Sequence, residues 1–210
     1  MVETLQLDPD RPLIICDADE VLLQFIVGLE NYLARQGFRL DLASFRIHGN
    51  VRHASTNEVA ADDRVTQLIA EFFAAETLHL EPVAGASEAL QNLSNRAQIV
   101  ILSNLPASSR QARMENLTRH GMAYPVIAGS GPKGTIVQSI IKDVVAPIVF
   151  IDDLPPHHAS VASVSPHVHR LHFVADPRLA RLIGASRDAH ARIDNWSDAE
   201  AWISSRIVGG

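Results

Sequence analysis

The chain has 210 residues, a formal net charge of -6 and one cysteine, Cys16. It is long enough to bury a sizeable core and carry an insert, and its negative charge excludes a general attraction to nucleic acid or anionic membrane surfaces, so the expected partner is a small molecule. One cysteine excludes an internal disulfide and is typical of a reducing compartment. Residues 1–11 lack the apolar segment of a secretion signal, and no later run approaches the length of a membrane span, which predicts a cytoplasmic protein.

The first third of the chain predicts one buried strand followed by a helical insert. Residues 13–16 are uniformly apolar, as expected of a strand buried on both faces of a parallel sheet. Apolar residues recur at helical spacing over 22–33 and again over 65–73, and a polar stretch, 41–63, separates the two predicted helices. We therefore expect residues 21–81 to form a small helical domain inserted into the chain.

Strand and helix patterns then alternate to the end of the chain. The sequence predicts strands over 98–102, 125–128, 147–151 and 169–174, and helices over 87–93, 108–120, 135–145, from Pro156 onward and over 194–203. Such alternation is typical of parallel strands joined by right-handed crossovers. We expect an α/β fold, a doubly wound, Rossmann-like parallel sheet built from residues 1–20 and 82–210.

Polar side chains stand where three of the predicted strands end. Asp17 and Asp19 follow the first strand, Ser103 and Asn104 follow the strand at 98–102, and Asp152 and Asp153 follow the strand at 147–151. Open parallel sheets build their ligand sites at the carboxyl ends of the strands, so we expect these groups to converge. A lysine, Lys133, stands in the turn before a predicted helix and is expected to join them.

This combination of residue types suits phosphoryl transfer through an aspartyl phosphate. Asp17 is the candidate nucleophile, because a carboxylate can attack phosphorus and form a labile acyl phosphate. Asp19 lies two residues further along an extended segment, where it can protonate the leaving alcohol and later activate water. Asp17 and Asp19 are therefore the first two candidate catalytic residues.

The remaining strand-end groups suit a metal and a phosphate. Asp152 and Asp153 add carboxylate oxygens for Mg²⁺, a hard cation that prefers oxygen ligands. Lys133 and the Ser103 hydroxyl are expected to contact the phosphoryl oxygens and stabilise the charge of the transition state, and Asn104 is assigned with them to phosphate binding.

In order, type and placement, these residues resemble the four motifs of the haloacid dehalogenase-like (HAD) superfamily. The motifs are the Asp-x-Asp of Asp17 and Asp19, then Ser103, Lys133, and Asp152 with Asp153. Residues 81–86, Glu-Pro-Val-Ala-Gly-Ala, are similar to the segment that re-enters the core after the cap domain of this family. The resemblance implies a HAD-like core and a helical cap at 21–81.

The resemblance also implies roles for single residues. By this resemblance, Asp17 is the nucleophile that attacks phosphorus, and it also binds Mg²⁺. The backbone carbonyl of Asp19 is a metal ligand, and the Asp19 side chain is the acid/base. Asp152 completes the metal shell, and Asp153 either ligates the metal or supports Asp152. Family members that cleave carbon–halogen or carbon–phosphorus bonds usually lack the second acid, so Asp19 favours phosphate esters. One departure is Glu20, where many relatives carry a small residue. The Glu20 carboxylate either narrows the substrate range or points to solvent.

Two arginines of the insert, Arg46 and Arg52, are candidate substrate contacts, because a guanidinium can bind a second anionic group. The histidine-rich stretch from His157 to His172 matches no zinc-binding spacing, so hydrogen bonding or surface polarity is the default interpretation. Within that stretch, His157 and His158 follow the Asp152 motif closely enough to support it.

The sequence therefore predicts a magnesium-dependent phosphomonoester hydrolase of a small metabolite that acts through an aspartyl-phosphate intermediate. Two alternatives stay open: a catalytically weak binding or regulatory protein of the same fold, and a phosphomutase, which would use the same two aspartates. A phosphoacceptor receiver domain fits less well, because its acidic pair comes early in the chain and here the adjacent pair comes late. Substrate identity and oligomeric state are open at this point.

Overall fold

The computed structural model describes residues 5–207 of the chain. A six-stranded, all-parallel sheet forms its centre, with the strand order β5-β4-β1-β6-β7-β8. The strands are β1 (Leu13–Cys16), β4 (Gln98–Asn104), β5 (Val126–Gly129), β6 (Ile148–Asp152), β7 (His169–His172) and β8 (Ala191–Arg192). The prediction of a doubly wound, Rossmann-like α/β core is confirmed.

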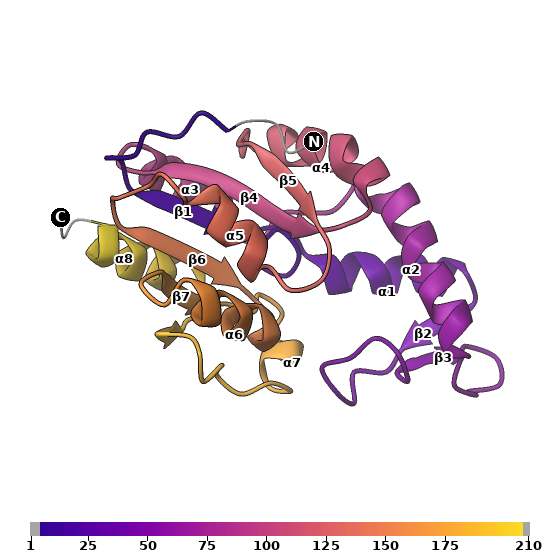
Figure 1. The fold of residues 1–210 in the computed structure, drawn as a ribbon. Coiled ribbons are helices and arrows are strands. Elements are labelled where there is room, and N and C mark those ends of the chain that lie inside the picture. The colour runs from indigo at the N-terminus through magenta and orange to yellow at the C-terminus, as the bar shows by residue number, and fades with distance from the viewer. Residues whose placement is uncertain (1–4, 208–210) are drawn as a thin grey trace.

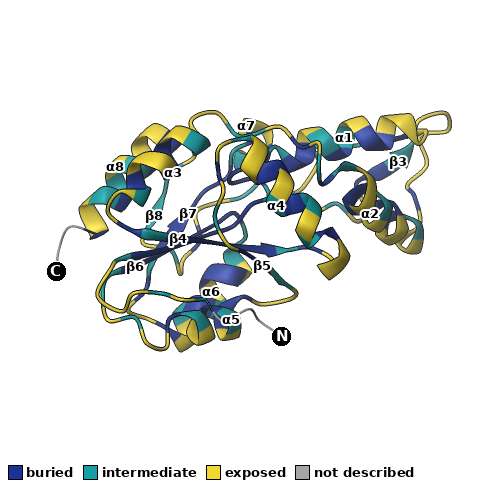
Figure 2. Ribbon diagram, turned by 90° about the horizontal axis from the view of Figure 1, so that it is seen from above, coloured by how far each residue is buried: buried dark blue, intermediate teal, exposed yellow. Residues whose placement is uncertain are grey.

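Helices cover both faces of this sheet (Figures 1 and 2). They are α3 (Ala86–Ser94), α4 (Arg110–Arg119), α5 (Gly134–Ile140), α6 (Pro155–Val164), α7 (Pro177–Ala180) and α8 (Trp196–Ile207), and a 3₁₀ turn, η1 (Ala107–Ser109), precedes α4. Side chains alternate across β1, so that Leu13 and Ile15 pack in the cluster on the α5–α6 face while Ile14 and Cys16 pack in the cluster on the other. Strand β1 is thus buried on both faces.

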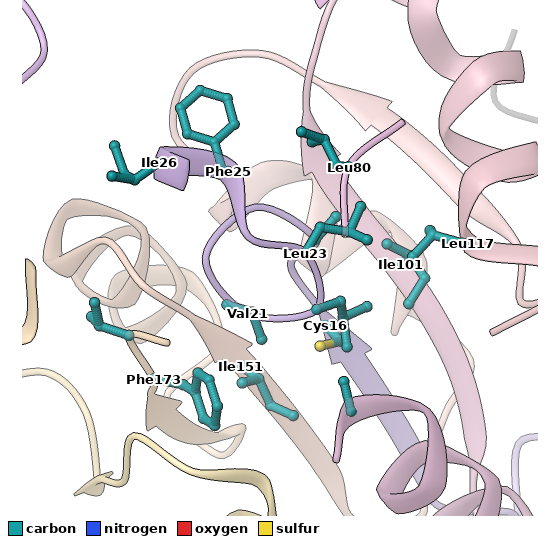
Figure 3. Close-up of a cluster of buried hydrophobic side chains, with 14 of the residues drawn as sticks. Cys16, Val21, Leu23, Phe25, Ile26, Leu80, Ile101, Leu117, Ile151 and Phe173 are labelled. Atoms are coloured by element: carbon teal, nitrogen blue, oxygen red, sulfur yellow. The ribbon is translucent and has the colours of Figure 1, made fainter. Parts of the chain in front are cut away.

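The larger apolar cluster continues from the sheet into the inserted segment. Close to the end of β1 it contains Cys16, Val21 and Leu23, and Phe25 and Ile26 extend it away from the sheet (Figure 3). The insert holds α1 (Phe25–Arg35) and α2 (Asp62–Glu76), which project from the core in Figure 1. Aromatic packing joins these two helices, since the rings of Phe25 and Phe72 meet edge to face with centroids 5.2 Å apart.

The insert is not purely helical, contrary to expectation. Between its helices lies an antiparallel hairpin of β2 (Phe38–Leu40) and β3 (Val51–His53), with register pairs from Phe38–His53 to Leu40–Val51. The prediction missed this hairpin because each strand has only three residues and carries polar side chains, so neither shows the alternation of a longer half-buried strand. The ten residues between the strands belong to the stretch that we interpreted only as polar.

Two contacts fix the insert, one between its own two ends and one to the core. Gln24 donates its backbone N–H to the carbonyl of Glu81 at 2.9 Å, so the outgoing and returning segments lie side by side. A bidentate ion pair adds a second connection, because Arg178 of α7 contacts Glu30 of α1 at 2.9 and 2.8 Å. The proposed division into core and cap stays a prediction, and residues 1–4 and 208–210 of the expected core lie outside the described residues.

The ends of several predicted elements shift. Helix α5 stops at Ile140 instead of 145, and β7 stops at His172 instead of 174. The short elements α7 and β8, of four and two residues, were not predicted. None of the helices in the described part of the chain combines the length and the apolar character that crossing a bilayer requires.

Candidate active site

The central strands bring the acidic motifs together. Strand β1 lies between β4 and β6, with Cys16 opposite Ile101 on one side and Ile151 on the other. Because the strands are parallel, the next residues along β1 and β6, Asp17 and Asp152, emerge at the same edge of the sheet. The register of three strands therefore explains why carboxylates far apart in the sequence share one site.

Lys133 lies fully buried between two of these carboxylates. Its Nζ is 2.9 Å from Asp17 Oδ1 and 2.7 Å from Asp152 Oδ2. Although burial disfavours a charged amine, Asp152 and Asp17 hold the pKa of Lys133 above its ordinary value. Burial also raises the pKa of Asp17, which the lysine partly counteracts. Lys133 lies immediately before α5, in agreement with the prediction that it stands in the turn before a helix.

Asp17, Asp152 and Asp153 form a set of oxygen donors suited to a cation. One carboxylate oxygen from each lies within 4.8 Å of the other two, and all three residues are buried. Burial, and next the charge of Asp152, raise the pKa of Asp153 well above its ordinary value. Lys133 pairs with Asp17 and Asp152, and three carboxylates beside one lysine leave the set with an excess of negative charge. Hard oxygen donors with such an excess fit Mg²⁺.

The Asp19 side chain lies outside this set and pairs with an arginine that sequence analysis missed. Arg113 Nη2 is 2.7 Å from Asp19 Oδ1, and the Arg113 side chain is fully buried on α4. Ser103 donates its hydroxyl to Asp19 Oδ2 at 3.4 Å. Burial raises the pKa of Asp19 and the Arg113 charge opposes that rise. The two aspartates of the first motif thus have different partners, Lys133 for Asp17 and Arg113 for Asp19.

Asn104 ends β4 and lines the cavity that contains Asp17, Asp19 and Asp153, whereas Ser103 and Lys133 are fully buried and do not line it. The Asn104 amide donates to the carbonyl of Gly131 at 2.9 Å, which ties β4 to the loop before Lys133. His157, another cavity residue, places Nε2 at 3.4 Å from the Asn104 amide nitrogen. Asn104 and His157 are therefore the uncharged polar groups of this cavity.

Glu20 points inward instead of to solvent. It has a left-handed φ of 59° and only 3% exposure. Its Oε1 accepts the backbone N–H of Ile26 at 2.7 Å, and its Oε2 accepts that of Asp176 at 3.2 Å. Burial raises the pKa of Glu20 to about 7, although these two hydrogen bonds oppose the rise. Glu20 therefore connects the beginning of α1 to the loop before α7.

Two buried histidines hold the backbone of the last acidic motif. His158 Nε2 donates to the carbonyl of Asp152 at 2.9 Å, and His172 Nε2 donates to that of Asp153 at 2.8 Å. Burial lowers the pKa of His158 to about 3 and also lowers that of His172, so both rings are neutral at pH 7. No histidine joins the candidate metal ligands in the described part of the chain. The support for Asp152 that we expected from this stretch comes from His158.

The two arginines of the insert occupy different environments. Arg46 lines the cavity above the carboxylates. Arg52 does not line this cavity; its Nε pairs with Asp41 at 3.2 Å, and its Nη1 donates to the carbonyl of Asn57 at 3.1 Å. The structure thus brings Arg46, but not Arg52, to the site.

No protein-family model matches the sequence, and neither does any curated protein. Solved structures do match. A haloacid dehalogenase-like family hydrolase from Streptococcus pneumoniae is 13% identical with a TM-score of 0.64, covering 93% of this chain and 99% of that one. A HAD family hydrolase from Deinococcus radiodurans with bound phosphate and sodium is 16% identical with a TM-score of 0.64, covering 95% and 97%. The L-2-haloacid dehalogenase PA0810 is 10% identical with a TM-score of 0.62, covering 93% and 99%. Similarity at such identities concerns the fold.

Proposed function

We propose that this chain, which has the fold of the haloacid dehalogenase-like hydrolases, is a magnesium-dependent phosphomonoester hydrolase that acts through an aspartyl phosphate. One observation carries the proposal: two aspartates two residues apart have separate environments. Asp17 lies with Lys133 and the other carboxylates, while Asp19 lies with Arg113. Two carboxylates kept apart in this way can take the two roles, nucleophile and acid/base, that the reaction needs.

In the first step, a carboxylate oxygen of Asp17 attacks phosphorus, and the bond from phosphorus to the ester oxygen breaks. The Asp19 carboxyl donates its proton to the departing alkoxide, which leaves as an alcohol. Lys133, with the hydroxyl and amide at the end of β4, is proposed to balance the charge on the phosphoryl oxygens. Arg113 is a positioning residue, because it holds the Asp19 side chain away from the metal ligands.

In the second step, the Asp19 carboxylate accepts a proton from water, the water oxygen bonds to phosphorus, and Asp17 is released together with inorganic phosphate. Asp17, Asp152 and Asp153 are proposed to hold Mg²⁺, with the backbone carbonyl of Asp19 as a further ligand. The bound ion supplies positive charge that offsets the repulsion between these carboxylates and an anionic substrate.

The acid at Asp19 favours an ester over a halide as the substrate. An alkoxide is a poor leaving group unless it gains a proton, whereas a halide leaves without one. A buried carboxyl whose pKa is raised is suited to donate that proton. Ester hydrolysis therefore uses the Asp19 proton in its first step, where departure of a halide needs no proton.

Arg46 is the residue of the insert that we propose as a substrate contact, since it lines the cavity. The proposed partner is a small phosphorylated metabolite and not nucleic acid or a membrane, in keeping with a net charge of -6. Cys16 is buried and unpaired, which supports a cytoplasmic location.

The test is phosphate release from a panel of small phosphomonoesters, with and without Mg²⁺. Asp17→Asn removes the nucleophile, and Asp143→Asn is the matched control because the Asp143 side chain is 76% exposed. We expect magnesium-dependent release by wild type and Asp143→Asn and none by Asp17→Asn. Release that survives unchanged in Asp17→Asn would remove the proposed nucleophile.

A further inference from the structure

The cavity above the carboxylates has an apolar wall. Its volume is about 240 Å³, and its floor includes Asp17, Asp19 and Asp153. The inserted segment and the core both contribute apolar side chains to the wall: Phe25, Ile26, Leu42, Phe45, Ile47, Phe73, Leu154 and Leu179. A phosphoryl group bound at the floor would direct its leaving group against these side chains.

The polar groups of the wall are few, and most already have partners. Both Glu20 oxygens accept backbone N–H groups, and the Asn104 amide nitrogen donates to a backbone carbonyl. Two buried polar atoms of the lining residues, Asn104 Oδ1 and His157 Nδ1, have no hydrogen-bond partner among the described residues. Arg46 is exposed and lines the cavity, so its guanidinium can pair with the anionic phosphoryl group while its stem covers apolar surface. A leaving group with four or five hydroxyls would lose more hydrogen bonds to water than these two unpaired atoms can replace.

Desolvation energies favour an apolar occupant in such an environment. A hydroxyl buried without a hydrogen bond is unfavourable, whereas each methylene transferred from water to an apolar site is favourable. A cavity of roughly 150 Å³ lined by Leu, Ile and Phe is known to accommodate benzene. The cavity of this protein is larger, and eight of its fifteen lining residues are apolar, so its apolar part can hold a group of about six carbon atoms beside the phosphoryl group.

We infer that the substrate is a phosphomonoester whose leaving group is a hydrocarbon, aliphatic or aromatic, and not a polyol. The inference rests on the proposed function, because it places the phosphoryl group at the carboxylate floor. It adds the substrate class, which the acidic motifs leave open. The wall that selects the hydrocarbon includes Leu42, Phe45 and Ile47, which lie in the loop between β2 and β3.

The first experiment compares primary alkyl phosphates in the presence of Mg²⁺. Over ethyl, butyl and hexyl phosphate, kcat/KM is expected to rise by about fourfold per methylene until the cavity is filled. Glucose 6-phosphate is the matched polyol, because it is also a primary phosphate on six carbons, and we expect its kcat/KM to be at least about tenfold below that of hexyl phosphate. A flat series, or a preference for glucose 6-phosphate, would overturn the inference.

Variants link the preference to the cavity wall. Phe45→Ser is expected to lower kcat/KM for hexyl phosphate by about tenfold and to leave ethyl phosphate within about twofold. Leu42→Asn, a second wall variant, should act in the same direction. Val59→Ser is the control, since Val59 belongs to the same insert, is 49% exposed and does not line the cavity. Equal losses for both substrates in both wall variants would count against selection by this wall.

A binding measurement separates failure of the inference from failure of the proposed function. Calorimetry compares hexyl phosphonate with methyl phosphonate on the wild-type protein with Mg²⁺, and no hydrolysis is needed. Burial of the hexyl chain should give the more negative heat-capacity change. If no phosphate ester is hydrolysed but this difference is found, the hydrolase proposal fails and the apolar site stands. Equal heat-capacity changes would overturn the inference whatever the activity.

Discussion

Arg113→Met is expected to destabilise the protein by about 3–5 kcal/mol, the usual effect of removing one partner from a buried ion pair. The Arg113 side chain is fully buried and lies 2.7 Å from Asp19 Oδ1, while 17% of the Asp19 side chain is exposed. The remaining contact of Asp19 to a side chain is the Ser103 hydroxyl at 3.4 Å, too long to replace a cation. Methionine preserves most of the length of the arginine stem, so the variant chiefly removes charge.

The destabilisation caused by Arg113→Met should increase as the pH rises. Arg113 opposes the rise in the pKa of Asp19, so its loss lets that pKa rise further. Protonation then relieves the unpaired carboxylate at low pH, and the destabilisation should grow as pH rises from about 5 to 8. The assay is urea denaturation of the metal-free protein at both pH values.

The matched control lies on the same helix. Arg119 pairs with Glu115 at 2.6 Å, but both side chains are about half exposed, so Arg119→Met should change the free energy of unfolding by no more than about 0.5 kcal/mol. The double variant Arg113→Met/Asp19→Asn should be more stable than Arg113→Met alone, because an amide replaces the unpaired carboxylate. A loss below about 1 kcal/mol in Arg113→Met that does not vary with pH would refute this reasoning.

Two further predictions concern Glu20 and the two arginines of the insert. The pKa of Glu20 rises from 4.5 to about 7 on folding, so its contribution to stability is complete below pH 4.5 and is lost as pH rises towards 7. Relative to Glu20→Gln, wild type should therefore lose about 3 kcal/mol of unfolding free energy over this range, measured by denaturation without metal. A constant difference between the two proteins would exclude Glu20 as the titrating group. For substrate binding, Arg46→Ala should raise KM about threefold to tenfold with kcat little changed, whereas Arg52→Ala should leave KM unchanged, because Arg46 alone of the two lines the cavity. Equal KM values for the two variants would contradict this assignment.

The core of the site could be predicted because each of its acids follows a buried apolar run. Strands that are apolar along their length must lie inside a parallel sheet, and their ends share an edge. That reasoning located Asp17 and Asp152, and the turn before a predicted helix located Lys133. The register of the sheet then determines which of these side chains come into contact, which the sequence alone does not show.

Arg113 could not be predicted because α4 has the composition of a surface helix. Its buried face carries Arg113, Asn116 and Leu117, of which only the leucine is apolar. The spacing of Arg113 and Leu117, four residues apart, was the available signal, since it places both side chains on one face. The role of Arg113 can be assigned only when the residue that it contacts is known, and the folded structure shows that this residue is Asp19.

The orientation of Glu20 also depends on tertiary structure. Its left-handed backbone turns the side chain inward, where one hydrogen-bond donor, the N–H of Ile26, is six residues away along the chain and the other, the N–H of Asp176, lies beside it only in the folded chain. The hairpin of the insert escaped prediction for a related reason, because strands of three residues are stabilised by their pairing and not by a local pattern. Both features therefore depend on contacts that form only when the chain folds.

The central claim is that Asp17 becomes phosphorylated and that Asp19 is needed to clear the adduct. Asp19→Asn should be incubated with an aryl phosphate, whose leaving group needs little protonation, in the presence of Mg²⁺, and then digested and analysed by mass spectrometry. We expect the mass of one phosphoryl group on the peptide that contains Asp17, and no added mass when Asp17→Asn is combined with Asp19→Asn. Phosphate found on another peptide, or an adduct that persists in the double variant, would contradict the account.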